Sequence, residues 1–201
     1  MTTNNWTMKK NTACIQMDVN RKIKIKLDTS GKILYVNNYF SEFTGFGVSD
    51  VILKDFNLLL DTSMPKLTEE MLKDLSKQYN SFHFIFKGSM NADSCYWGFV
   101  RVSKTTNEET GEVKGLLIEI KMLPTTAITK VEKMYEVITE IEKNAGIDAA
   151  KKYFNGYLEE RNIDFEEYIL SLVEIDGKKA EAYFDIDADK VIKKKKKKSW
   201  F

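Results

Sequence analysis

The sequence predicts an α+β domain: a five-stranded antiparallel sheet with short helices on one face, followed by an α-helical C-terminal extension. Three observations predict this class. Residues 22–27 alternate strictly between lysine and apolar side chains, and residues 67–79 carry an apolar residue at every fourth position. Three further β-type runs lie between residues 82 and 122. Alternation is typical of a half-buried strand and a four-residue repeat of an amphipathic helix, so strands flank helices along the chain.

The first half of the domain is expected to be a hairpin followed by short helices. Its predicted elements are a strand at 22–27, a turn at Asp28–Gly31, a strand at 33–36, a short helix ending at Gly45, a helical turn within 48–56 and a helix at 67–79. The turn is assigned because Asp and Ser bond their own backbone and Gly tolerates a positive φ. Gly45 ends its helix for the same conformational reason.

The second half is expected to complete the sheet and then become helical. Strands are predicted at 82–86, 96–102 and 116–122, and Pro124 marks the change in character. The apolar stripes of three helices follow, one over 128–141, one after a cap at Asp148, and one after a capping box formed by Asp164 and Glu167. These stripes need partners, which are each other, the sheet or a second copy.

This order divides the chain into four segments. We expect a flexible N-terminal cap at 1–20, a globular domain at 21–124, a helical extension for signalling or dimerisation at 125–175, and an acidic segment with a polybasic aromatic tail at 176–201. Between residues 132 and 189 there are 16 acidic and 7 basic side chains, although the net charge of the whole chain is only +1.

Composition excludes several classes of protein. Hydrophobic residues make up 43% and charged residues 30% of the chain, which fits a globular protein, and no apolar run approaches the length that spans a bilayer. The N-terminus lacks a signal-peptide hydrophobic region. Cys14 and Cys95 lie far apart, so neither a zinc site nor a disulfide framework is suggested, and Cys95 is expected to be a small buried hydrophobic residue. We expect a cytoplasmic protein without a bound metal.

One stretch resembles a known family. The pattern that carries the resemblance comprises Asp28, Gly31, Ile33, Tyr35, Asn37, Phe40, Thr44, Gly45 and Phe46, then Phe56-Asn57, Met64-Pro65 and Tyr96-Trp97. Over about half of the chain it resembles PAS sensory domains, and among them the FAD-binding PAS domain of bacterial aerotaxis and energy-taxis receptors, here in a stand-alone form. The resemblance implies a cupped sheet that holds a small molecule against its helices.

The resemblance also implies a binding site. The cofactor-binding residues expected on this basis are Asn37, Phe40, Phe46, Leu60, Phe82, Phe84 and Trp97. FAD is the cofactor it implies, with haem as a weaker alternative through His83, the only histidine. Two departures stand against FAD: Leu60-Asp61-Thr62-Ser63 replaces the family's Arg-His-x-Asp stretch, and Phe82 replaces its pocket tryptophan.

Several side chains keep two interpretations. Asn37 either binds a ligand or caps the following helix. The aromatic residues either stack on a flat cofactor or fill the core. If Phe82, Phe84 and Phe86 face the cavity, His83 faces away from it. Trp97 is not assigned to a face, because Tyr96-Trp97-Gly98-Phe99 is apolar on both sides.

The function implied by the resemblance is signal transduction. We expect a cytoplasmic PAS sensor of redox state or energy taxis that uses a bound flavin and relays to a chemotaxis transducer or other signalling protein, as a homodimer. The alternative is a cofactor-free PAS module for protein interaction. No enzyme is expected, since the carboxylates lie at solvated helix spacings and form no acid–base pair.

The C-terminal tail carries six consecutive lysines followed by Ser199, Trp200 and Phe201. Lys193–Phe201 is interpreted as a solvated end, as an attachment to an anionic membrane surface or receptor, or as a site for an acidic partner; nucleic acid is not expected.

Overall fold

The hairpin predicted at residues 22–36 begins the sheet in the computed structural model, which describes residues 14–173 and Phe184. Within residues 14–173 the sheet contains five strands: β1 (Ile23–Leu27), β2 (Ile33–Val36), β3 (Ser81–Ser89), β4 (Cys95–Thr106) and β5 (Val113–Met122). All neighbours are antiparallel, in the order β2-β1-β5-β4-β3. The first and last strands of the sequence therefore pair at the centre, and β2 and β3 lie at the edges.

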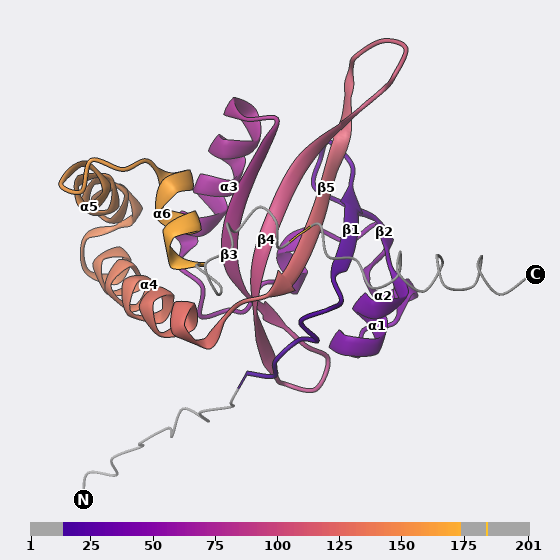
Figure 1. Cartoon of the computed structure of the whole chain (residues 1–201), viewed down its shortest axis with the longest axis horizontal. Helices are drawn as coiled ribbons and strands as arrows, with labels where there is room; N and C mark the ends of the chain where they lie inside the picture. Colours follow the sequence, from indigo (N-terminus) through magenta and orange to yellow (C-terminus); the bar gives the residue numbers. More distant parts are fainter. Residues whose placement is uncertain (1–13, 174–183, 185–201) are drawn as a thin grey trace, which may run out of the picture.

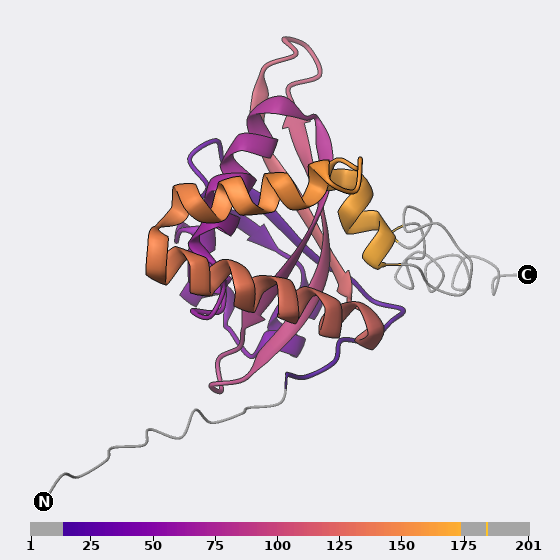
Figure 2. The same ribbon diagram turned by 90° about the vertical axis from the view of Figure 1, so that its left-hand side faces the viewer.

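The helices lie on both sides of this sheet (Figure 1). In chain order they are α1 (Asn38–Thr44), α2 (Val48–Val51), the 3₁₀ turn η1 (Phe56–Leu59), α3 (Lys66–Gln78), α4 (Thr125–Ala145), α5 (Ile147–Glu159) and α6 (Phe165–Leu172). The first three cover one face, and α4 to α6 cover the other. Figure 2 shows α4 and α5 side by side across the sheet. The predicted extension thus packs on itself and on the sheet, which are two of the three partners expected for its apolar stripes.

Two hydrophobic cores follow from this arrangement. We call the face toward α1, α2 and η1 the inner face, and the face toward α4 to α6 the outer face. Strand alternation sends Phe82, Phe84 and Phe86 into the inner core, and sends Ile85 into the outer core. Phe165 of α6 is packed against both cores.

The helix ends follow the local sequence. Gly45 ends α1 with φ +76°, and the Asp164–Glu167 capping box begins α6, as predicted. The prediction that Asp148 caps the second helix of the extension is wrong. Helix α5 is preceded by Gly146, and Asp148 lies in its first turn. There its carboxylate still faces the positive end of the helix dipole.

The N-terminal segment from Cys14 to Asp18 is fastened to the domain. Cys14 forms a disulfide with Cys95, and the amide of Ile15 donates to the carbonyl oxygen of Cys95 at 2.7 Å. Met17 is buried, and the amide of Asp18 donates to the hydroxyl of Tyr39 at 2.8 Å. The sequence suggested no disulfide framework, and this pairing corrects that expectation, whereas Cys95 is buried as expected. A separation of 81 residues gives no local sign of pairing, because only the fold brings the two together.

Contacts also occupy the free edge of β3. The amide of His83 donates to Glu166 of α6 at 2.8 Å, and the carbonyl of Ile85 accepts from the hydroxyl of Tyr135 of α4 at 2.6 Å. The carbonyl of Lys87 accepts from the amide of Asp61 at 2.9 Å. In the part of the chain described, no helix is both long and apolar enough to cross a membrane.

Candidate functional site

The inner face is the site predicted from the sequence. It is built from alternate residues of three strands, so that Phe84 of β3 lies opposite Val100 of β4, and Val100 lies opposite Ile120 of β5. Helix α1 contributes Phe40, whose position three residues before Phe43 puts both rings on the helix face toward the sheet.

The structure brings together five of the seven predicted site residues. Phe40, Leu60, Phe82 and Phe84 lie in the inner core, and each is at most 8% exposed. Phe46 packs against the same core, with its ring 6.4 Å from that of Phe40. The four core side chains are therefore enclosed by protein atoms, whereas Phe46 is partly buried.

A flavin does not fit this packing. Ligand sites for molecules of this size have volumes of about 300–1,000 Å³. Phe86 instead contacts the ring of Phe56 at 6.1 Å and that of Tyr96 at 5.9 Å, edge to face in both cases. A separate cavity of about 20 Å³ lies between β3 and helices α3 to α6, where Phe84 meets residues of the outer core, and it is also too small for a flavin. The aromatic side chains thus fill the core, and an isoalloxazine ring would have to displace them.

Asn37, the sixth predicted residue, has its amide committed to the backbone. Its Oδ1 accepts from the amides of Lys24 at 3.0 Å and Phe40 at 3.3 Å, and its Nδ2 donates to the carbonyl of Lys22 at 3.0 Å. It caps α1 and joins that helix to the start of β1. The capping interpretation describes this geometry, and its binding of a ligand stays a prediction.

Trp97, the seventh, lies on the outer face and apart from the other six. Its ring centroid is 6.0 Å from that of Tyr135 in α4, and it belongs to the outer core. Because β4 is apolar on both faces, its sequence shows no alternation of apolar and polar residues from which the orientation of Trp97 could be assigned.

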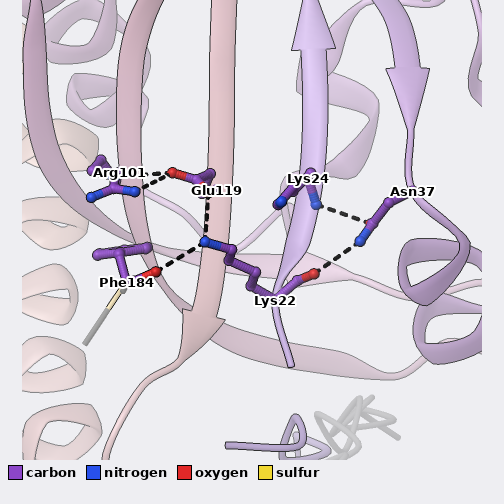
Figure 3. Close-up of polar contacts among 6 residues, drawn as sticks. All are labelled: Lys22, Lys24, Asn37, Arg101, Glu119 and Phe184. Atoms are coloured by element: carbon purple, nitrogen blue, oxygen red, sulfur yellow. Dashed lines mark hydrogen bonds and ion pairs between the residues drawn. The ribbon is translucent and has the colours of Figure 1, made fainter. Parts of the chain in front are cut away.

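The outer face carries a buried charged cluster that sequence reasoning missed. Nζ of Lys22 lies 2.8 Å from Oε1 of Glu119, and Nε of Arg101 donates to Oε2 of Glu119 at 3.0 Å (Figure 3). Lys22 and Glu119 are each 7% exposed. Burial raises the pKa of the Glu119 carboxyl, but the hydrogen bonds from Lys22 and Arg101 outweigh this and hold the pKa below its usual range. The alternation Ile118-Glu119-Ile120-Lys121 resembles that of a solvated strand face, so it gave no signal of burial.

His83 lies beside this cluster. Its Nδ1 pairs with Oε1 of Glu166, and its ring stacks on that of Phe99 at 5.3 Å. Burial raises the pKa of the Glu166 carboxyl, but hydrogen bonds from the ring and amide of His83 outweigh this and lower the pKa. The histidine faces away from the inner core, as predicted, and it is enclosed on the outer face. Its Nε2 has no hydrogen-bond partner among the described residues, but the ring is buried against Phe99, so haem could reach this nitrogen only by displacing the packing around it.

Phe184 completes the outer face. It is 1% exposed, and its ring lies 5.1 Å from that of Phe99 and 5.6 Å from that of His83. The guanidinium of Arg101 lies 4.7 Å from its ring centroid, and its carbonyl oxygen accepts from Nζ of Lys22 at 2.9 Å. No sequence pattern marked Phe184, which follows Tyr183 in an acidic stretch.

The described residues contain no group of three or more His, Cys, Asp or Glu side chains that could hold a metal ion. The predicted roles of Lys193–Phe201 lie outside the described residues.

Comparison with known proteins gives a structural match only. Neither a family model nor a curated protein matches the sequence. The light-state structure of the blue-light photoreceptor Aureochrome1 LOV is similar with a TM-score of 0.50 at 10% identity, over 55% of this chain and 88% of that chain. A light-oxygen-voltage domain studied with a flavin analogue is similar with a TM-score of 0.49 at 17% identity, over 56% of this chain and 87% of that chain.

The strand order, the helices on the inner face and this similarity decide the fold. The chain has the PAS fold. The match covers 55% of this chain, and the layer of α4 to α6 with Phe184 lies on the outer face of its sheet.

Proposed function

We propose that this chain is a PAS-type signal-transduction module that works through protein contacts and needs no resident cofactor. In this proposal a change in the packing of the inner core is passed to the helices on the outer face. A signal can act only by favouring one of two packings over the other, so the two cores must be in mechanical contact.

Phe165 is the observation that carries the proposal. Its ring lies 5.9 Å from that of Phe84 in the inner core and 6.2 Å from that of Phe154 in α5. Phe154 in turn contacts Tyr168 of α6 edge to face at 5.8 Å. Because rings in contact shift together in a packed interior, we expect a movement of Phe84 to be passed to Phe165, and hence to α5 and α6.

The coupling is tested by hydrogen exchange in two inner-core variants. Phe84→Leu removes the ring that contacts Phe165, whereas Phe56→Leu removes an inner-core ring that contacts Phe86 instead. We expect Phe84→Leu to speed amide exchange in Phe165–Leu172 and Phe56→Leu to leave it unchanged. Equal exchange in the two variants would show that the inner core is not coupled to α6.

A redox or energy-taxis sensor with a bound flavin, signalling to a chemotaxis transducer, is the second candidate. The sequence resemblance supports it. So does the buried hydroxyl of Tyr96 in the inner core, which has no hydrogen-bond partner among the described residues. The packed rings around it weigh against this candidate.

A visible absorption spectrum of freshly purified protein, with any released small molecule identified by mass, separates the two candidates. The cofactor-free module is expected to be colourless and to release nothing. The bands of isoalloxazine would establish the flavin sensor and require the inner rings to rearrange.

A further inference from the structure

The site around Phe184 is formed mainly by the sheet. Its walls are Lys22 just before β1, His83 of β3, Phe99 and Arg101 of β4, and Glu119 of β5, which Figure 3 shows in part. Sheet pairing fixes the main-chain positions from which the four strand residues project toward this face. Phe184 occupies the site that they form, as a bound residue would.

The chemistry of the site matches a peptide containing an aromatic residue. The guanidinium of Arg101 lies over the face of the ring, and the rings of His83 and Phe99 lie against it at interplanar angles of 35° and 43°, which is typical of aromatic recognition. Nζ of Lys22 donates a hydrogen bond to the main-chain carbonyl of Phe184, a group that every peptide carries at this position. The side chain of Phe184 contributes no polar contact, so shape and main chain determine what binds.

Charge complementarity defines the flanking residues of the peptide. Within and beside this cluster, the outer face presents Lys22, Arg101 and Lys121 against the carboxylates of Glu119 and Glu166. Residues 181–189 carry one Glu and three Asp, and no Lys or Arg. Opposite charges attract more strongly where water is excluded than on an open surface, so the excess of basic groups favours an acidic segment as the partner.

We propose that the outer face is a docking site for an acidic protein segment containing phenylalanine, and that Phe184 fills this site in cis. A partner that carries the same chemistry must displace Phe184, whose tether gives it a high effective concentration at the site. This inference rests on the proposed function, because it names the partner that a signalling module of this kind would contact. The segment that carries Phe184 therefore competes for the site, and only a partner that binds more strongly than this segment can displace it.

The test uses the whole chain and a fluorescent peptide. The probe is a labelled peptide of residues 180–188, and its polarisation is measured with the wild-type chain and with the Phe184→Ala chain. We expect saturable binding to Phe184→Ala that weakens with salt, and binding to the wild type that is about tenfold or more weaker, because the tethered residue competes. A peptide in which alanine replaces Phe184 should bind neither chain.

A matched control shows whether loss of any aromatic residue creates binding. Tyr79→Ala removes an aromatic side chain that is 48% exposed, and it should behave as the wild type does. If Phe184→Ala fails to fold, as judged by circular dichroism, Phe184→Leu keeps most of the buried volume while removing the ring. The same peptide should bind it more tightly than it binds the wild type.

Three outcomes would overturn the proposal. The peptide could fail to bind a folded Phe184 variant, or it could bind the wild type equally well. The wild type could also be a dimer by light scattering that Phe184→Ala dissociates, which would make the occupant a second copy. Peptide binding does not depend on the absorption spectrum or on exchange in α6, so this inference and the proposed function fail separately.

Discussion

At the scale of single residues, the backbone contacts of Asn37 are expected to stabilise the fold by a measurable amount. Asn37→Ala removes the cap of α1 and the links from Asn37 to Lys22 and Lys24. We expect the free energy of unfolding to fall by about 1–2 kcal/mol, measured in urea. Asn57→Ala, at an exposed position, is the control and should change it by less than about 0.5 kcal/mol.

Glu119 offers a contrast between buried and exposed ion pairs. Glu119→Gln leaves Lys22 and Arg101 without their counter-charge in a buried site, so we expect a loss of about 3 kcal/mol in the free energy of unfolding at pH 7. Glu42→Gln breaks the pair with Arg21, in which the Glu42 side chain is 55% exposed, and should cost at most about 1 kcal/mol. Equal losses would contradict the burial of the cluster.

At the scale of elements, the contact between α6 and β3 makes stability depend on pH. The folded-state pKa of Glu166 lies below its ordinary value of 4.5. A carboxyl of this kind stabilises the fold above its unfolded pKa, and this stabilisation is lost as the pH falls through the lower folded pKa. We expect Glu166→Gln to be less stable than the wild type at pH 6, with the difference shrinking as the pH falls below 4.5.

Urea unfolding at a series of pH values checks this expectation. Glu159→Gln, an exposed substitution on α5, should follow the wild type throughout. The free energy of unfolding could instead differ between Glu166→Gln and the wild type by the same amount at every pH. In that case the variant would have lost stability through packing rather than through the charge of Glu166.

The elements themselves were largely predictable, because their signals are local. The alternation of lysine and apolar residues predicted β1, and an apolar residue at every fourth position predicted α3. Gly45 and the Asp164–Glu167 pair marked helix ends. What local sequence could not provide was the face of a strand that is apolar on both sides, which left Trp97 unassigned. The ring contacts of Phe165 are equally invisible, since they depend on how distant elements pack.

At the scale of the whole molecule, the disulfide ties the N-terminal segment to β4. Its loop of about 80 residues is long, and such a link constrains the unfolded chain by about 4 kcal/mol in the chain-entropy model. We expect the Cys14→Ser/Cys95→Ser chain to unfold at lower urea than the oxidised wild type. Adding a reductant should lower the urea concentration at which the wild type unfolds toward that of the variant. The unfolding of the variant should stay the same.

The candidate site was predictable only in its fold. The resemblance indicated a PAS sheet, and most of the predicted residues lie in one core, but the size of side chains in contact decides whether that core has room. The charged cluster with Lys22 and Phe184 was missed because it joins residues 162 positions apart. Neither composition nor spacing reports such pairs.

The covered edges of the sheet limit how copies of this chain can associate. On β3, side chains of α4 and α6 and the amide of Asp61 take the outward-facing main-chain groups. On β2, Ile33 exchanges hydrogen bonds with Leu53 and Lys54. An uncovered edge invites strand addition, domain swapping and aggregation. Because both edges are engaged at these positions, any assembly of this chain is expected to join through side chains on its faces, and fibrils that grow by strand addition should require α6 to detach first.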